Sequence, residues 1–179
     1  MKKNYFLHTA ILLVALVCGS VPVWSQTYKK ISSIEELTDG KYVIAYENMA
    51  MENKANGSRI AATAINVTDN AIISPDASII WEITTTANGM SINNNGTYVV
   101  GVNSNNASLS SNFEEKTCEW NFSVEKDNFR ATNVQYSNRF LQYNSSKWFA
   151  CYQSNSNQKD LTLYKLEETG KSNPELTFS

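Results

Sequence analysis

The chain has 179 residues, 42% of them hydrophobic, with 15 Lys and Arg, 17 Asp and Glu, and one histidine. This slightly acidic balance without a basic cluster excludes a nucleic-acid surface, which needs several cations to displace counterions, and an electrostatic membrane surface. Asn and Ser are abundant, Leu is sparse, and β-branched and aromatic residues recur in short bursts, a composition that predicts an all-β chain with polar loops.

Residues 1–25 have the pattern of a secretory signal peptide. Two lysines precede an apolar run at about residues 6–17, and small residues then lead to a predicted cleavage site after Ser25. The run is shorter than the ~20 apolar residues of a membrane-spanning helix. Lipidation at Cys18 is disfavoured because the bulky Val17 precedes it. We therefore expect an exported bacterial protein, at the cell surface or in the periplasm, that does not insert into the membrane after cleavage.

Short runs that alternate or stay apolar, bounded by Asn, Asp, Gly and Ser, predict β-strands over the rest of the chain. One helical turn is expected at residues 32–37, because Ser32 and Glu35 fit a capping box. The twelve expected strands are residues 28–31, 41–46, 59–66, 79–84, 89–92, 97–102, 107–111, 118–124, 128–132, 139–143, 148–152 and 161–166.

Three similar sequence segments recur along the chain, and each is followed by a segment of a second recurring kind. The openers are "DGKYVIAYEN", "NGTYVVGVNS" and "SNRFLQYNSS", and the closers are "IIWEIT", "CEWNFS" and "DLTLYK". The closers are evenly spaced, with 39 residues from Trp81 to Trp120 and 41 from Trp120 to Leu161. The first block is longer, and we assign its surplus to a polar insertion at residues 47–59. A period near 40 residues with four strands per unit indicates internal repetition.

Side-chain alternation in the closers predicts one buried face and one solvent face. The expected buried residues are Ile79, Trp81 and Ile83 in the first closer and Cys118, Trp120, Phe122 and Val124 in the second. Three such faces around a pseudo-threefold axis would fill a common core. Three units are too few for a propeller, which needs at least about four blades.

Three units of four strands resemble the β-trefoil, best known from ricin-type lectins. The last block lacks a strand after residue 166, and the N-terminal strand is expected to close this last repeat. The resemblance covers about residues 27–168 and implies carbohydrate binding. The sequence departs from the ricin-type pattern, because Ile79 and Cys118 stand where that family has Gln, and Leu161 stands where it has Trp. No Asp follows each opener to clamp a sugar.

Few side chains suited to catalysis remain after signal cleavage. The only histidine, His8, is removed, which excludes Ser-His-Asp and Cys-His arrangements and the usual zinc sites. Glu114 and Glu115 are adjacent, so on a strand they point to opposite sides. Cys118 and Cys151 remain as either a disulfide or two buried thiols, and we favour thiols. We expect no enzyme, no cofactor and no metal.

Binding chemistry gathers in residues 143–158, where aromatic and neutral amide side chains occur together. An aromatic face matches the C–H faces of a sugar, and amides match its hydroxyls without burying a charge. The alternative is that Trp148 and Tyr152 form the packed side of their strand. The candidate ligand-binding residues are Trp148, Tyr152, Tyr143, Asn144, Gln153 and Asn155.

The domain predicted over residues 26–168 is thus an exported, non-enzymatic binding module whose partner is a glycan or another surface protein. A first alternative is a protein-interaction, spacer or adhesion module without a sugar site. A second is a glycan-active enzyme or its accessory domain. Residues 169–179 are predicted to be a linker or the start of a following domain, since "NPELTF" is similar to the opening of Ig-like repeats.

Overall fold

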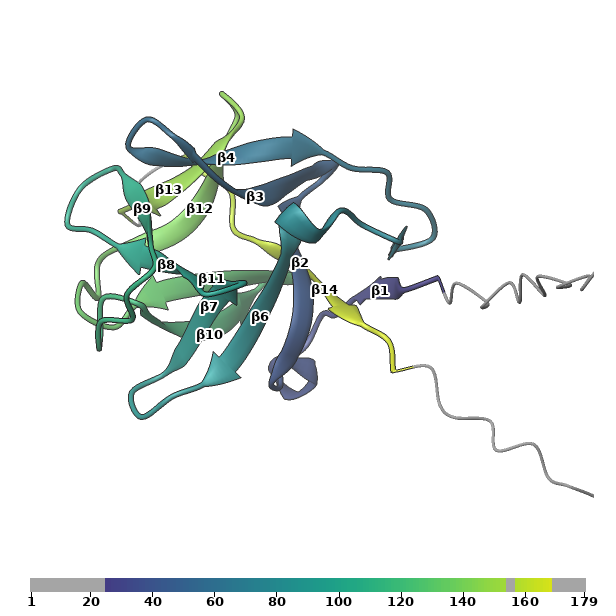
Figure 1. The fold of residues 1–179 in the computed structure, drawn as a ribbon, viewed down its shortest axis with the longest axis horizontal. Coiled ribbons are helices and arrows are strands. Elements are labelled where there is room, and N and C mark those ends of the chain that lie inside the picture. The colour runs from purple at the N-terminus through teal and green to yellow at the C-terminus, as the bar shows by residue number, and fades with distance from the viewer. Residues whose placement is uncertain (1–24, 154–156, 169–179) are drawn as a thin grey trace, which may run out of the picture.

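The computed structural model describes residues 25–153 and 157–168 and confirms the all-β prediction (Figure 1). Apart from Ser25, the predicted signal peptide lies outside the described residues, as do Asn155 and the predicted tail. The described elements are β1 (Thr27–Lys30), η1 (Ile34–Glu36), β2 (Gly40–Tyr46), β3 (Met49–Asn56), β4 (Arg59–Ala64), β5 (Ala71–Ile73), η2 (Ala77–Ile79), β6 (Ile80–Thr85), β7 (Met90–Asn94), β8 (Thr97–Gly101), β9 (Ala107–Ser110), β10 (Glu119–Glu125), β11 (Asn128–Asn133), β12 (Phe140–Asn144), β13 (Trp148–Tyr152) and β14 (Thr162–Leu166).

Six strands form a closed barrel, and three hairpins cover one end of it. The barrel runs β14-β2-β6-β7-β10-β11, with antiparallel pairing throughout. A bridge between Phe129 and Leu161 joins β11 to the start of β14 and closes the ring. The hairpins β3–β4, β8–β9 and β12–β13 gather toward the upper left in Figure 1, and β4 also pairs with β13. Closure leaves no free edge among the barrel strands.

The pairing shows three equivalent units of four strands. The units are β2-β3-β4-β6, β7-β8-β9-β10 and β11-β12-β13-β14. In each unit the first strand pairs with the fourth at the same place, through Tyr42–Trp81, Met90–Trp120 and Phe129–Leu161. These side chains belong to one hydrophobic core. The predicted threefold repetition is confirmed.

The two core tryptophans also hold the hairpins in place. The Trp81 indole donates a hydrogen bond to the Met51 carbonyl at 2.9 Å, and the Trp120 indole donates to the Val99 carbonyl at 3.2 Å. Each acceptor lies in the second strand of its own unit. Because a buried indole N–H is costly to leave unpaired, each tryptophan fixes the barrel and its hairpin together.

The first unit corrects the predicted insertion at residues 47–59. Its residues form β3 and the turn into β4, and β3 is a hairpin strand whose register with β4 shifts between Met51 and Ala55. The sequence looked like an insertion because the outer half of β3 is polar and exposed. The extra residues instead lie between β4 and β6, where β5 pairs with β1. The first opener is therefore a barrel strand, whereas the other two openers, β8 and β12, are hairpin strands.

The N-terminal strand closes onto the last repeat as predicted. β1 pairs with β14 in the register Tyr28–Leu166. The last unit has its own fourth strand, β14, so β1 extends the sheet beyond it. The predicted helical turn is η1, shifted by one residue from the expected cap, because the Glu36 carboxylate accepts hydrogen bonds from the backbone N–H groups of Ser32 and Ser33.

The predicted faces of the closers are confirmed in part. Trp81, Trp120 and Cys118 are buried, while Asn121 on the opposite face of β10 is exposed. Ile79 is buried in a second hydrophobic cluster outside the common core, and Phe122 and Val124 are only half-buried. Glu119 is buried on the face predicted to meet solvent. Both predicted thiols are free and buried. Burial raises the pKa of Cys151 to about 11, so this thiol is unreactive at neutral pH.

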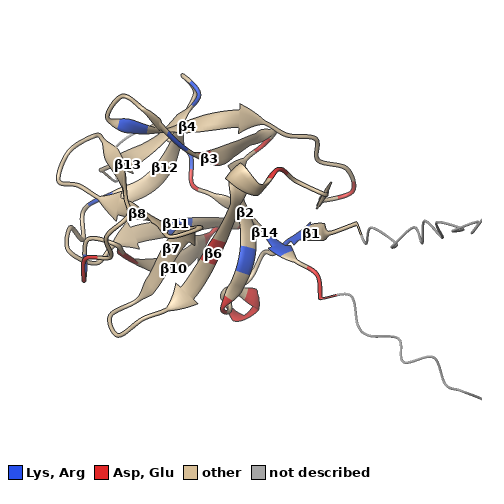
Figure 2. Cartoon of the chain, in the orientation of Figure 1, with Lys and Arg blue, Asp and Glu red and all other residues tan. Residues whose placement is uncertain are grey.

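Charge is sparse along the described chain. Figure 2 shows Lys and Arg spread over several strands, with most of the ribbon carrying neither sign. Within the described residues, no helix is long and apolar enough to cross a membrane. Nor do three His, Cys, Asp or Glu side chains of that part lie together as metal ligands.

Trp120→Ala is expected to cost about 3–5 kcal/mol of unfolding free energy, because it leaves a cavity in the shared core. Asn121→Ala, on the exposed face of the same strand, is the control and should change stability by less than about 0.5 kcal/mol. Urea denaturation of both variants measures the difference. Equal midpoints would show that the indole does not fill the core.

Candidate functional site

The outward face of the third hairpin carries aromatic and polar side chains together. The register of β12 and β13 places Phe140 opposite Tyr152, Gln142 opposite Ala150, and Asn144 opposite Trp148. Since side chains alternate along a strand, these six residues share one face. The intervening residues Leu141, Phe149 and Cys151 are buried in the core, and Ala150, Tyr152 and Gln142 of this face are buried as well, so Phe140, Asn144 and Trp148 are its partly exposed members. We call this outward surface the third-hairpin face.

Strand β4 extends the third-hairpin face on one side. β13 pairs with β4 through Trp148–Ala61 and Phe149–Ile60. Continuing this register places Arg59 beside Ala150, on the outward side. The Arg59 guanidinium carbon accordingly lies 4.4 Å from the centroid of the Trp148 ring. This is a cation–π contact between the first and third units.

Trp148 is braced from a second direction. Its indole Nε1 donates a hydrogen bond to the Tyr152 hydroxyl at 2.9 Å. Tyr152 is almost fully buried, whereas Trp148 stays half-exposed. Tyr152 thus orients the indole, and Trp148 presents aromatic surface to solvent.

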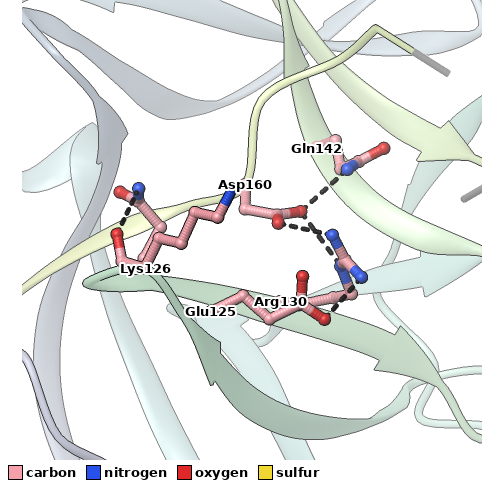
Figure 3. Close-up of polar contacts among 6 residues, drawn as sticks. Glu125, Lys126, Arg130, Gln142 and Asp160 are labelled. Atoms are coloured by element: carbon pink, nitrogen blue, oxygen red, sulfur yellow. Dashed lines mark hydrogen bonds and ion pairs between the residues drawn. The ribbon is translucent and has the colours of Figure 1, made fainter.

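A polar cluster flanks the other end of the third-hairpin face (Figure 3). Asp160 accepts a hydrogen bond from the Gln142 amide at 2.7 Å, and it forms an ion pair with Arg130 Nη2 at 2.8 Å. A second nitrogen of Arg130, Nη1, lies 2.6 Å from Glu125 Oε1. The Arg130 guanidinium also lies over the Phe140 ring, 5.2 Å from its centroid. Gln142 and Arg130 therefore fix the Asp160 carboxylate beside the aromatic surface.

The pairing keeps Arg130 charged. The hydrogen bonding that Arg130 donates to Asp160 raises the pKa of Arg130, against the opposing effect of partial burial, and the charges of Asp160 and Glu125 add to the rise. The side chain of Asp160 is 14% exposed. Its carboxylate has about four acceptor directions, of which Arg130 and Gln142 occupy three, so an acceptor remains for a ligand.

The structure places the sequence-predicted residues in different surroundings. Trp148, Tyr152 and Asn144 share the third-hairpin face, and Gln153 is exposed just after β13. Tyr143 lies on the opposite, core side, where its ring stacks on Tyr46 with centroids 5.4 Å apart and tilts against Phe149.

Asn144 is partly committed to the hairpin turn, since its side-chain oxygen accepts a hydrogen bond from the Ser146 backbone at 2.8 Å. Asn155 lies outside the described residues.

Four residues of this region were not predicted from the sequence: Arg59, Arg130, Gln142 and Asp160. Gln142 carried a local signal, because it alternates with the buried Leu141 and shares its side of β12 with Asn144. The other three come from β4, β11 and the approach to β14. Only the antiparallel pairing brings these segments beside the third hairpin.

Comparisons with known proteins support the fold. No protein-family model matches the chain, and no curated protein matches it. A Polyporus squamosus lectin, solved with a human-type influenza-binding epitope, superposes with a TM-score of 0.55 at 16% identity over 72% of this chain and 50% of the lectin.

Two further solved structures are similar to this chain. An endo-β-galactosidase from Clostridium perfringens that releases GlcNAcα1-4Gal gives a TM-score of 0.57 at 12% identity over 72% of this chain and 32% of the enzyme. The BEL β-trefoil gives 0.54 at 11% identity over 73% of this chain and 95% of that one. The domain is a β-trefoil. The chain spans half the length of the lectin and about a third of the enzyme, so these likenesses carry the fold alone.

The trefoil offers the same outward position three times, and its chemistry differs in each unit. The residue before Trp81, Trp120 and Leu161 is Ile80, Glu119 or Asp160. Its cross-strand partner is Val43 for Ile80 and Ser91 for Glu119. In the third unit the corresponding pair is Arg130 and Asp160. The three positions are therefore apolar, polar and ionic in turn.

In the first trefoil unit this position is covered. β1 and β5 pack over it and build a second, outer hydrophobic cluster. The buried members of this cluster are Tyr28, Val43, Ala45, Ala50, Ile72, Ile79 and Tyr164. The unit's outer surface is thereby used for packing.

In the second trefoil unit the carboxylate is used internally. Glu119 accepts hydrogen bonds from the Lys116 backbone at 2.7 Å and the Asn88 amide at 2.8 Å. Burial acts to raise the pKa of Glu119, but hydrogen bonds from Thr86, Lys116 and Asn88 outweigh it and lower that pKa. Glu119 is thus a fixed structural anion, and the third unit alone of the three equivalents keeps a partly exposed carboxylate.

A cavity beside β5 is the main contrast to the third-hairpin face. Its volume is about 460 Å³, and it lies between the first hairpin and the segment before β6. Its lining includes Glu52, Thr63, Asn66, Asp76 and several aliphatic side chains, with no aromatic ring. It therefore lacks the surface on which a sugar ring stacks.

Glu119→Gln is expected to reduce the loss of stability on acidification. Since the folded-state pKa of Glu119 is below its ordinary value of 4.5, the stabilisation from its ionised form is complete above that value. It disappears as the pH falls through the lower folded-state pKa. Urea denaturation at pH 7 and pH 3 should show a smaller drop in the variant than in the wild type.

Glu82→Gln, which removes an exposed carboxylate on β6, serves as the control and should keep the wild-type drop. An identical drop in Glu119→Gln and the wild type would contradict a stabilising role for the buried anion.

Proposed function

We propose that the protein binds carbohydrate, without catalysis, through the third-hairpin face. The observation that carries the proposal is the divergence of the three trefoil units. One outward position is the partly buried, apolar Ile80, which packs against the outer cluster, and one is a buried glutamate bonded within its own unit. The third keeps half-exposed aromatic rings next to an oriented carboxylate.

The chemistry of this face matches a sugar. Trp148 and Phe140 offer apolar surface for C–H faces, and they lie about 13 Å apart along the hairpin at ~3.3 Å per residue. Asp160 and Asn144 offer oxygen atoms to hydroxyl groups, which neutral and charged acceptors pair with readily. Tyr152 and Gln142 are too buried to meet a ligand, and they act by positioning Trp148 and Asp160.

Two of the similar solved structures support carbohydrate as the ligand class. One is a lectin bound to a glycan, and another is a glycan-cleaving enzyme that is three times as long as the shared region. In this chain Asp160 and Glu125 are both ion-paired to Arg130, an arrangement that holds carboxylates in place and does not suit proton donation. Binding without catalysis is therefore the function that the geometry supports best.

The second candidate function is a protein-interaction module, favoured by the hairpin turns and by exposed apolar residues such as Phe113 and Ile73. We propose export to the cell surface for either function, on the basis of residues 1–25. A single open face implies weak binding, with a Kd on the order of 1 mM, or about −4 kcal/mol. Neighbouring domains or several copies would then supply avidity.

Trp148→Ala is expected to weaken glycan retention by at least about tenfold, because it removes the exposed aromatic surface. Affinity electrophoresis through polysaccharide gels and a glycan array measure the change. Phe113→Ala is the matched control, since it removes a ring that is 41% exposed in the second unit. It should leave retention unchanged. Full retention by a folded Trp148→Ala protein would place the site elsewhere.

Asp160→Asn should also weaken retention, by a smaller factor, because an amide oxygen accepts more weakly than a carboxylate. Loss of retention by Phe113→Ala together with unchanged binding by both third-unit variants would instead favour the second unit.

A further inference from the structure

We propose that Arg59 makes the third-hairpin face selective for sugars that carry a carboxylate, such as uronic or sialic acids. The proposal rests on the proposed function and names its ligand class. Arg59 begins β4 in the first trefoil unit, and its guanidinium carbon lies over the Trp148 ring, 4.4 Å from the ring centroid. The residue is half-buried at the junction of two units.

Arg59 is a cation without an anionic partner in the described chain. Its Nε atom is buried and has no hydrogen-bond partner. The ion pairs found in residues 25–153 and 157–168 are Lys29–Glu167, Arg130–Glu125 and Arg130–Asp160, and none involves Arg59. Nε is shielded from solvent, so the Nη atoms are the donors of Arg59 that a ligand can reach.

The other two arginines, Arg130 and Arg139, show how guanidinium groups with a structural role are bonded in this protein. Arg130 is paired with two carboxylates. Arg139 donates to the side-chain oxygens of Asn103 and Asn105 at 3.3 and 3.0 Å. Arg59 differs from both, because its ordered contact is the stack on Trp148. That contact holds the guanidinium beside Trp148, and no carboxylate of the described residues pairs with it.

A carboxylate is the group that fits the hydrogen-bonding edge of Arg59. The guanidinium presents parallel N–H donors that match two carboxylate oxygens, and its two Nη atoms form such a pair. A sugar resting on the exposed part of Trp148 has its substituents within reach of this edge. The protein is acidic overall, so the attraction comes from Arg59 and not from the net charge.

The test is retention of matched glycan pairs that differ in one carboxylate. We would use α2-6-sialyl-N-acetyllactosamine against N-acetyllactosamine, and trigalacturonic acid against its methyl ester. The wild type should retain at least one acidic member about tenfold better than its neutral counterpart. Arg59→Gln should remove this preference, while Arg59→Lys keeps part of it.

Lys41→Gln, which removes an exposed cation on β2, is the control for net charge and should keep the preference. Thermal melting of each variant checks that it is folded. Equal retention of acidic and neutral members by the wild type, or an unchanged preference in Arg59→Gln, would overturn the role of Arg59 while leaving carbohydrate binding intact. Failure of the wild type to retain any glycan would overturn both.

Discussion

The burial of one large side chain per unit at the same place in the barrel is the constraint on which the rest of the structure depends. Trp81, Trp120 and Leu161 fill the core from three directions. Each faces a residue of its unit's first strand, and the two indoles also donate a hydrogen bond to a carbonyl oxygen of the second strand. Barrel closure and hairpin placement therefore come from the same few side chains.

Once the core fixes the backbone, the outward positions are free to differ. The residue that precedes each core side chain is isoleucine, glutamate or aspartate in the three units. The isoleucine packs against the cluster that β1 and β5 help to build. The glutamate accepts hydrogen bonds from its own unit, and Asp160 stays near the surface. A threefold scaffold has thus been turned into one with a single open face, and that asymmetry is the basis of the functional proposal.

Much of the fold was predictable from the sequence because its determinants are local. Alternation within the closers identified Trp81 and Trp120 as core residues, and their spacing indicated the repeat. β3 was missed because its outer half is polar and exposed, which removes the apolar pattern that marks a strand. Matching openers by similarity then aligned β2 with β8, although these strands occupy different places in their units.

The candidate site was only partly predictable, for a different reason. Trp148 and Tyr152 alternate on one strand, so their shared face is a local property. Tyr143 was grouped with them by proximity, although the alternation from Leu141 places it on the core side. Arg59 and Asp160 reach the face through pairing between distant segments, and no local pattern encodes that meeting.

The central claim is that ligand binding is confined to the third unit, and the indole N–H signals of the mature protein test it most directly by NMR. Trp81, Trp120 and Trp148 are the described tryptophans, and the first two are fully buried in their own units. Titration with the glycan that the array retains best should shift the Trp148 signal and leave the other two in place. A shift at Trp81 or Trp120 with Trp148 unmoved would contradict the account.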